Sequence, residues 1–471
     1  MRIRFTLKYI LTIGLCLLIF SARAQKKPIA LHQKNLHYFT YRGKPTILIT
    51  SAEHYGAVVN LDFDYITYLD ELKSHGLNLT RTFTGAYIEP AGAFSITNNT
   101  LAPAAGRLIC PWKRSSQTGY AGGGNKFDLN QWDEAYFRRL KDFVAQAQNR
   151  GVIVELAFFC PFYDESQWKV SPMNAVNNIN NIGNIASKNV YTLDKSGELL
   201  NVHDRLVKKI VDEFRNYDNL IYEICNEPYF GGVTMDWQHH IAETIRAAEQ
   251  GFKYQHLISQ NIANNTLKIK DPHPAVSVFN FHYATPPLAV ADNYHLNKVI
   301  GDNETGFAGN ADETYRMQGW LFILAGGSLY NNLDYSFTAE KENGSYQYPA
   351  TQPGGGSTAL RKQLGFLQHF MRSIDFINMQ PDLTFVKTAF SKNARVQALV
   401  NPGRQYALYL YGEQKKELEL ELPAGKYQIQ WMNTLTGAWE GHHNVSHPGG
   451  MLKLPIPVYQ SDIAVRIESE K

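Results

Sequence analysis

Two glutamates, Glu227 and Glu304, occupy the positions in this sequence that best suit acid–base or nucleophilic chemistry. The first follows an apolar, β-prone stretch at 220–225 and precedes Pro228, and the second follows a similar stretch at 299–302. Proline has no backbone N–H to give to a sheet, so Pro228 fits the end of a strand. Carboxylates at the carboxyl ends of buried strands lie where barrel enzymes hold their reactive groups. A pair of this kind suggests cleavage of a glycosidic bond, in which one carboxyl group donates a proton and the other, ionised, attacks or stabilises the anomeric carbon.

The segments that would position these glutamates alternate between strand-like and helix-like patterns from residue 45 to residue 375. Eight short apolar stretches are predicted as strands, at 45–50, 77–83, 152–159, 220–225, 256–260, 276–281, 298–302 and 328–333. Repeated units of this length indicate a parallel sheet, which is either open and doubly wound or closed. Eight units favour closure, so the predicted fold class is α/β, a (β/α)8 TIM barrel.

Longer amphipathic stretches between these strands predict the helices, at 62–75, 131–149, 201–216, 234–250, 310–323 and 357–374. A long insertion rich in Gly, Pro, Ala and Asn occupies 85–127, and Asp128 is a plausible start signal for the helix after it. A second long polar loop covers 160–200.

The pattern changes after Pro381. Hydrophobic residues then mostly alternate with period two, between turns that contain Gly and Pro, at 396–400, 406–411, 418–422 and 427–431. This is typical of a small antiparallel β-sandwich, which we interpret as a structural clamp because its strands show no exposed aromatic row. The predicted division is a signal peptide at 1–24, a catalytic barrel at 25–380 and a sandwich domain at 381–471. Residues 26–44 are expected to add an edge strand to either domain.

The N-terminus has the three parts of a secretory signal. Arg2, Arg4 and Lys8 precede an apolar run at 9–20, and Ser21-Ala-Arg-Ala24 supplies small residues for cleavage. The run is too short to span a bilayer, so we expect an exported protein, periplasmic or extracellular, with no membrane span after cleavage. Cleavage would remove four basic residues and no acidic ones, taking the net charge from +3 to about −1. A near-neutral chain gives no reason to expect nucleic acid or an anionic membrane as a partner.

Cysteine usage argues against a metal site. Cys110, Cys160 and Cys225 remain after cleavage, an odd number without CxxC spacing, so a zinc site is not expected and at most one disulfide can form. Phosphate-binding loops and Gly-rich dinucleotide fingerprints are missing from the sequence. We therefore predict no cofactor and no metal; the sequence makes no prediction about oligomeric state.

Four further polar residues close predicted strands and should meet the glutamates in one barrel mouth: Arg81, Asn226, His282 and Tyr283. An Arg beside a carboxylate favours its ionised form, and a Tyr hydroxyl can orient it. Two of these residues also have plain structural readings, since Arg81 could be a core ion pair and His282 a satisfied barrel histidine.

Loop residues supply additional candidates for substrate contact. His54 and Tyr55 follow the first strand, Tyr163 and Trp168 lie in the third βα loop, and Asn332 and Asp334 follow the eighth strand. An aromatic side chain can stack on a sugar face, and amides and carboxylates can bind its hydroxyls. The alternatives are loop structure, hydrophobic anchoring and turn formation respectively.

These motifs together resemble the clan A retaining glycoside hydrolases, the superfamily of the family 5 cellulases. Asn226-Glu227-Pro228 is similar to their acid/base signature, Gly76-Leu-Asn-Leu-Thr-Arg81 to their second strand, and Asn303-Glu304-Thr305-Gly306 to their nucleophile strand. Phe281-His282-Tyr283 resembles their sixth strand, although there His and Tyr are separated. The eighth strand also departs, because it ends in Tyr330-Asn-Asn-Leu-Asp-Tyr335 where family 5 typically has a single Trp.

The resemblance implies a role for each matching residue. Glu227 would be the general acid/base, Glu304 the nucleophile, and Asn226 a ligand of the sugar 2-hydroxyl. The expected function is an exported β-glycosidase that cleaves a poly- or oligosaccharide by retaining double displacement. The alternatives are a transglycosylase with the same two glutamates and a catalytically silent carbohydrate-binding barrel protein.

Overall fold

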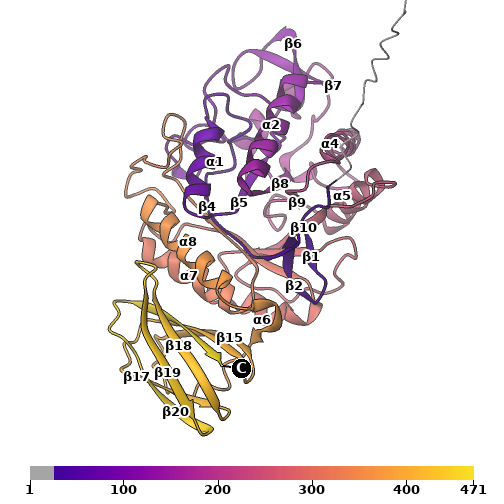
Figure 1. The fold of residues 1–471 in the computed structure, drawn as a ribbon. Helices are drawn as coiled ribbons and strands as arrows, with labels where there is room; N and C mark the ends of the chain where they lie inside the picture. The colour runs from indigo at the N-terminus through magenta and orange to yellow at the C-terminus, as the bar shows by residue number, and fades with distance from the viewer. Residues whose placement is uncertain (1–25, 471) are drawn as a thin grey trace, which may run out of the picture.

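Eight parallel strands form the centre of the protein (Figure 1). The computed structural model describes residues 26–470. In chain order the strands are β4 (Leu48–Ala52), β5 (Leu79–Phe83), β8 (Ile153–Phe159), β9 (Leu220–Cys225), β10 (Leu257–Asn264), β11 (Val278–His282), β12 (Val299–Thr305) and β13 (Leu329–Leu333). They pair in the order β4-β13-β12-β11-β10-β9-β8-β5, so the predicted α/β barrel fold is confirmed.

The ring closes between β4 and β5 largely through one side chain. Asn78, just before β5, gives its backbone N–H to Ile49 O at 3.3 Å. Its Oδ1 accepts from Ile49 N at 3.0 Å, and its Nδ2 donates to Ile47 O at 2.8 Å. A side-chain amide thus supplies the donor and acceptor that a full strand ladder would supply elsewhere.

Helices surround the sheet as the sequence predicts. The long ones are α1 (Tyr65–Ser74), α2 (Glu134–Arg150), α4 (Leu199–Phe214), α5 (Met235–Ala248), α7 (Asp312–Leu324) and α8 (Thr358–Arg372), and the short ones are α3 (Glu165–Val170) and α6 (Leu288–Asn293). Among residues 26–470, none of the helices has the length and apolar character needed to cross a membrane. The predicted signal peptide at 1–24 lies outside the described residues.

The start of α2 differs from the prediction. Asp133 caps this helix by accepting hydrogen bonds from the N–H groups of Ala135 and Tyr136. Asp128 instead belongs to β7 (Asn125–Trp132), which forms a hairpin with β6 (Trp112–Thr118). The insertion after β5 therefore carries its own antiparallel ribbon, whose last strand takes the residues read as the first turn of the helix.

The first strands of the described chain close the bottom of the barrel. β1 (Ala30–His32), β2 (Asn35–Tyr41) and β3 (Lys44–Thr46) form a separate antiparallel sheet and not the expected edge strand of either domain. Apolar side chains of this segment pack against one residue from near the start of each barrel strand: Ile29, Phe39 and Tyr41 against Leu48, Leu79, Ile153, Ile221, Leu257, Val278, Val299 and Leu329. The amino-terminal end of the barrel is thereby sealed, which leaves the opposite end for a site.

Antiparallel strands make up the C-terminal region, as predicted. They are β14 (Gln380–Pro381), β15 (Arg395–Asn401), β16 (Gln405–Tyr411), β17 (Glu417–Leu422), β18 (Gly425–Asn433), β19 (Trp439–His447), β20 (Gly450–Pro455) and β21 (Asp462–Ser469). Six of them form the sheet β14-β15-β16-β21-β18-β19, and β17 pairs with β20. A second hydrophobic cluster, which includes Leu408, Leu420 and Ile429, fills the space between the two sheets.

Helix α7 attaches this region firmly to the barrel. The ring of Trp320 stacks on Tyr409 of β16 with centroids 5.3 Å apart. Beside them Arg316 makes a two-pronged ion pair with Asp462, at 3.0 Å from Nε and 2.8 Å from Nη2, and the Tyr409 hydroxyl donates to the same carboxylate at 2.9 Å. Both charged residues are buried, so the pair holds only while the two regions are packed together.

We expect Asp462→Asn to lower the free energy of unfolding by about 3 kcal/mol, because it leaves the buried Arg316 guanidinium without a counter-charge. Urea unfolding followed by tryptophan fluorescence measures the loss. Asp212→Asn is the matched control, because its pairing with Arg215 spans 3.8 Å at the surface and should contribute less than about 1 kcal/mol. Equal effects of the two changes would contradict a structural role for the buried pair.

Candidate active site

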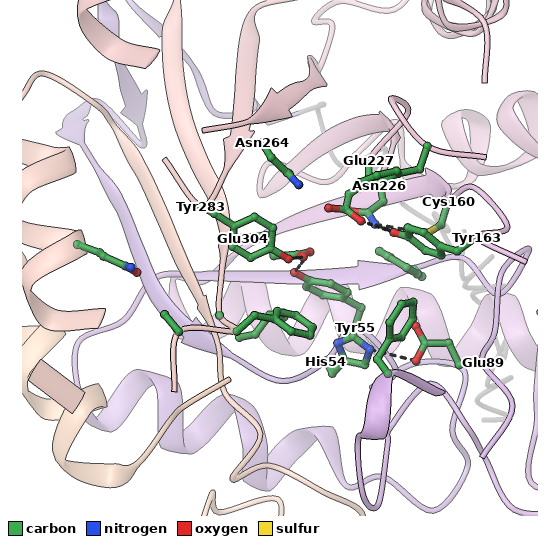
Figure 2. A pocket seen from close by; sticks show the side chains of 18 of the residues that line it. His54, Tyr55, Glu89, Cys160, Tyr163, Asn226, Glu227, Asn264, Tyr283 and Glu304 are labelled. Carbon is green, nitrogen blue, oxygen red and sulfur yellow. Dashed lines mark hydrogen bonds and ion pairs between the residues drawn. The ribbon is translucent and has the colours of Figure 1, made fainter. Parts of the chain in front are cut away.

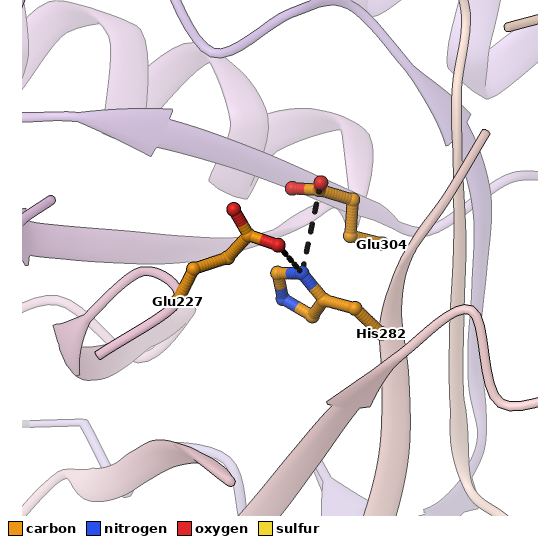
Figure 3. A group of neighbouring side chains, drawn as sticks. All are labelled: Glu227, His282 and Glu304. Atoms are coloured by element: carbon orange, nitrogen blue, oxygen red, sulfur yellow. Dashed lines mark hydrogen bonds and ion pairs between the residues drawn. The ribbon is translucent and has the colours of Figure 1, made fainter. Parts of the chain in front are cut away.

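Glu227 and Glu304 face each other across one pocket at the carboxyl ends of the strands (Figure 2). The pocket has a volume of about 550 Å³, and both side chains line it. One carboxylate oxygen of each glutamate and the Nδ1 atom of His282 all lie within 4.8 Å of one another (Figure 3). Two carboxyl groups at this separation suit a retaining glycosidase, in which they stand about 5–5.5 Å apart, and are too close for the inverting geometry of about 6.5–9.5 Å.

Glu304 is held as an anion by four neighbours. Its Oε2 accepts from the Tyr55 hydroxyl at 2.8 Å and from Arg81 Nη1 at 3.2 Å, and its Oε1 accepts from the Tyr283 hydroxyl at 2.6 Å. Burial alone would raise the pKa of Glu304, but His282, Arg81 and the two hydroxyls outweigh it, so the pKa lies below its ordinary value. A buried, ionised carboxylate with its lone pairs directed by fixed donors suits attack on an electrophilic carbon.

Arg81 owes its place to Glu223, which the sequence analysis did not single out. Nε of Arg81 donates to Glu223 Oε2 at 2.7 Å, and Nη2 donates to Glu223 Oε1 and to Asn226 Oδ1. Its remaining nitrogen, Nη1, reaches Glu304. Arg81 therefore has both of the roles considered for it: it forms a core ion pair, and it contacts the candidate nucleophile.

A floor of buried polar side chains supports this ion pair from below. Glu223 also accepts from Asn303 Nδ2 and Asn261 Nδ2, at 3.1 and 3.2 Å, and Asn303 Nδ2 bonds Glu155 Oε2 at 3.1 Å as well. Burial and the nearby Glu223 carboxylate raise the pKa of Glu155. An acidic residue inside an otherwise apolar strand indicates a buried charge with a partner in the barrel interior. Both Glu155 in β8 and Glu223 in β9 show this pattern.

His282 lies between the two candidate carboxylates. Its Nδ1 is 3.2 Å from Glu227 Oε1 and 3.6 Å from Glu304 Oε1, while its Nε2 is 3.1 Å from Asn261 Nδ2. An amide NH2 can only donate, so Nε2 accepts and the proton of a neutral ring sits on Nδ1. The same three groups could chelate a cation in principle, but a protonated Nδ1 offers no lone pair to a metal, and the arrangement fits a hydrogen-bond donor shared by two carboxylates.

Tyrosines surround Glu227. Tyr163 donates its hydroxyl hydrogen bond to Oε2, and the Tyr229 hydroxyl lies 3.3 Å from Oε1. Asn226 turns its Oδ1 toward Arg81, which directs its Nδ2 to the Tyr163 hydroxyl at 3.1 Å. Glu227 itself adopts a positive φ of 35°, a sharp turn after β9 that aims its side chain into the mouth.

Among the loop candidates, three line the pocket. Tyr55 reaches Glu304 as described, Tyr163 reaches Glu227, and His54 Nε2 lies 3.2 Å from Oε2 of Glu89, another pocket residue. His282 is buried beneath the mouth and touches both glutamates from there.

The predictions for Trp168, Asn332 and Asp334 need correction, because none of the three lines the pocket. Trp168 is buried, and its Nε1 donates to Ile185 O at 2.8 Å, which makes it an anchor of the third loop. Asn332 donates to Ser51 Oγ at 3.0 Å between β13 and β4. Asp334 is fully buried and paired with Arg361 at 2.6 Å.

Several lining residues escaped the sequence analysis as contacts for a substrate. Glu89, Asn264 and Gln318 add polar groups, and Phe94, Phe230 and Phe307 form a half-exposed aromatic rim. Glu89 and the three phenylalanines lie in connections that carry no periodic pattern, whereas Asn264 ends β10 and Gln318 lies in α7.

Fold and site together define a glycoside hydrolase: a (β/α)8 barrel with two paired glutamates in its mouth. A family model described as cellulase (glycosyl hydrolase family 5) matches residues 63–324, and the chain belongs to that family. The chain resembles a family 5 glycoside hydrolase from Bacteroides vulgatus, at 12% identity and a TM-score of 0.63 over 94% of each chain. It also resembles a mutant of the family 5 mannosidase from Rhizomucor miehei, at 11% identity and a TM-score of 0.50 over 74% of this chain and 99% of that one.

At such low identities these likenesses establish the fold. No curated protein sequence matches the chain. Cys110, Cys160 and Cys225 are all buried and free, so the structure contains no disulfide among its described residues.

We expect Tyr283→Phe to move the acidic limb of the kcat/KM profile to higher pH. The phenol hydrogen bond favours the ionised form of Glu304 and so lowers its pKa, and its loss lets the carboxyl group take up a proton at a less acidic pH. The same change should lower kcat/KM about 10-fold, the cost of one hydrogen bond to a charged group.

Tyr136→Phe is the matched control for that profile, since it removes a buried hydroxyl of α2 for which the structure shows no hydrogen-bond partner among residues 26–470. An unchanged acidic limb in Tyr283→Phe would show that this hydroxyl does not set the ionisation of the nucleophile.

Proposed function

We propose that this enzyme hydrolyses β-glycosidic bonds of an oligo- or polysaccharide with retention of configuration, Glu304 acting as nucleophile and Glu227 as acid/base. The observation that carries the proposal is the short separation of the two carboxylates, which have oxygens within 4.8 Å of each other. Only Glu304 of the two is paired with Arg81. The family to which the chain belongs makes a carbohydrate the expected substrate.

The first step forms a covalent intermediate. A carboxylate oxygen of Glu304 attacks the anomeric carbon while the bond from that carbon to the leaving oxygen breaks, and the proton of Glu227 passes to the leaving oxygen. The products of this step are a glycosyl ester on Glu304, a free alcohol and an ionised Glu227.

The second step returns the enzyme to its starting state. Glu227, now a base, removes a proton from a water molecule whose oxygen attacks the same carbon from the side that the leaving group vacated. The ester bond breaks, Glu304 regains its charge, and the sugar leaves with its original configuration.

The surrounding donors divide the two roles. Glu304 is met by Arg81 and two phenols, so it is the group stabilised as an anion. Glu227 has no Arg or Lys ion pair in the described chain and is bonded instead by phenols and the His282 ring. Asn226, held through its Oδ1 by Arg81, lines the pocket and is the proposed ligand of the sugar 2-hydroxyl, which would take its Nδ2 in place of the Tyr163 hydroxyl.

Export is part of the proposal and rests on the signal-like N-terminus alone. A polysaccharide too large to cross a membrane would be met on the outer side of it.

We expect Glu304→Gln to abolish hydrolysis of 4-nitrophenyl β-glycosides, because an amide cannot form the glycosyl ester. Glu227→Ala should lower activity on substrates with poor leaving groups by about 10²–10⁴-fold, and much less on 2,4-dinitrophenyl glycosides, which need no proton. Added azide should then rescue the Glu227→Ala variant and give a β-glycosyl azide. Glu198→Gln, an exposed glutamate before α4, is the control.

The stereochemistry and the covalent step have their own readouts. Proton NMR of the first product should show the β-anomer, and a 2-deoxy-2-fluoro glycoside should label the peptide that contains Glu304. An α-anomer as first product would sink the retaining mechanism. Transfer to added alcohols exceeding hydrolysis would identify a transglycosylase, and sugar binding with no turnover in any assay would identify a silent binding protein.

A further inference from the structure

Two long loops meet above the end of β4, beside the pocket, and the first of them contributes Glu89 and Phe94 to the pocket lining. One follows β5 and the other follows β13, the two neighbours of β4 in the barrel. Thr97 joins them: its N–H and its hydroxyl both donate to Gln352 Oε1, at 2.9 and 2.7 Å, and its hydroxyl lies 3.1 Å from that of Tyr346. We call residues 89–101 and 346–352 the wall.

The wall is fastened to the barrel at its base. Thr100 donates its hydroxyl to Glu53 Oε2 at 2.7 Å and to His54 O at 2.8 Å. Its backbone packs directly on Gly56, where a Cβ atom would lie 2.2 Å from the carbonyl carbon of Thr100, so only glycine permits the approach. Leu101 O accepts the N–H of Glu89 at 3.0 Å. The wall is therefore a packed part of the barrel mouth.

A buried carboxylate and imidazole face the pocket from the base of the wall. Glu89 accepts from His54 Nε2 at 3.2 Å, from the Tyr87 hydroxyl at 3.1 Å and from Asn99 Nδ2. The other ring nitrogen of His54, Nδ1, is buried and has no hydrogen-bond partner among residues 26–470. Glu89 fixes the ring with its Nε2 proton toward the carboxylate, so Nδ1 of the neutral ring is left to accept a hydrogen bond from a sugar hydroxyl.

The base of the wall, where Glu89 bonds His54, stands on the side of the sugar that becomes attached to the enzyme, while the ring of Phe94 packs on Tyr163 with centroids 5.3 Å apart. Glu227 protonates the leaving oxygen, so the leaving group lies on its side, among Tyr163 and Tyr229. His54 lies on the other side, next to Tyr55, with ring centroids 5.4 Å apart (Figure 2). Because Tyr55 bonds Glu304, a sugar joined to Glu304 fits between Tyr55 and the wall.

We infer that the enzyme is exo-acting: it removes one sugar at a time from the non-reducing end, whose terminal ring is recognised by His54 and Glu89 against the wall. This inference rests on the proposed function. A chain that continued past the terminal ring would run into the base of the wall, where Glu89 lines the pocket. Desolvated hydroxyl contacts at this point select for a chain end, since a site built to bond a hydroxyl rejects a substrate that lacks it.

The decisive substrates differ only at the non-reducing end. 4-Nitrophenyl β-glycosides of glucose, mannose, galactose and xylose identify the sugar. Oligosaccharides of that sugar, labelled at the reducing end, should then shorten by one residue per step. The same oligosaccharides carrying a 4,6-O-ethylidene group on the terminal ring, or for xylose a 4-O-methyl group, should resist cleavage by at least about 10²-fold.

Glu89→Gln tests the recognition directly. It keeps the shape of the side chain and removes the charge that orients His54, and kcat/KM on the preferred 4-nitrophenyl glycoside should fall about 10-fold to 100-fold. Deoxy analogues of the terminal ring supply a readout that a merely structural role would not move. Removing the recognised hydroxyl from the substrate should lower kcat/KM of the wild type by the same factor of about 10 to 100. It should lower kcat/KM of Glu89→Gln only slightly, because in a double-mutant cycle two changes that remove one interaction do not add.

The double variant Thr97→Ala, Gln352→Ala unties the wall, and it should raise cleavage of the end-blocked oligosaccharide relative to the free one. The exposed pair Thr118→Ala, Gln117→Ala, of the same residue types in β6 and the insertion, is the control and should leave the ratio unchanged.

The outcomes separate the two proposals. Rapid internal cleavage of end-blocked oligosaccharides by the wild type, with 4-nitrophenyl glycosides also hydrolysed, would overturn exo action and leave the glycosidase function intact. Failure to hydrolyse any glycoside in the panel, in the folded wild-type enzyme, would overturn both.

Discussion

The ion pair between Arg81 and Glu223 is the interaction on which the site depends. The two oxygens of Glu223 take Nε and Nη2 of the guanidinium, Nη2 also reaches Asn226, and the remaining nitrogen, Nη1, reaches Glu304. Such a buried pair is costly to desolvate and holds only when every lone pair and proton has a partner. Here the requirement is met by amides from other strands, so side chains of four strands, β5, β9, β10 and β12, are bonded together beside the candidate nucleophile. The charge that holds Glu304 ionised is thus positioned by the barrel interior before any substrate arrives.

Glu223 serves both sides of the site. Through Arg81 it supports Glu304, and through Asn261 it fixes the ring of His282, whose Nδ1 proton then points at Glu227. The two candidate carboxylates therefore share one scaffold, and their separation is set by strand geometry. This is why a short distance between them is informative: neither glutamate sits on a free loop, and each is held by several donors.

Sequence patterns were sufficient to predict the barrel and the proximity of Glu227 and Glu304, because both follow from the periodic spacing of apolar residues. Eight apolar stretches lie on the eight strands, and polar residues at their ends meet in one mouth. Orientation within loops has no such rule. Asp334 looked like a sugar ligand but pairs with Arg361, 27 positions later, and Trp168 turns inward to bond Ile185. The packing of β1 to β3 against the amino-terminal end of the barrel could not be predicted either. Alternation of apolar residues shows that a segment is a strand, but it does not show which surface the strand covers.

Loops and strands thus carry different parts of the function. The strand ends fix the chemistry, which needs two carboxylates at a set distance and one positive group. The loops decide which part of a carbohydrate can reach that chemistry. In this chain the insertion after β5 is tied down at Gly56 and Glu53 and joined to the loop after β13, so packed backbone lies beside His54. The opposite side, near Glu227, is bordered by the exposed ring of Phe230. In the proposed exo action, the packed side of the mouth would demand one terminal sugar, and the side edged by an aromatic ring would accept many leaving groups.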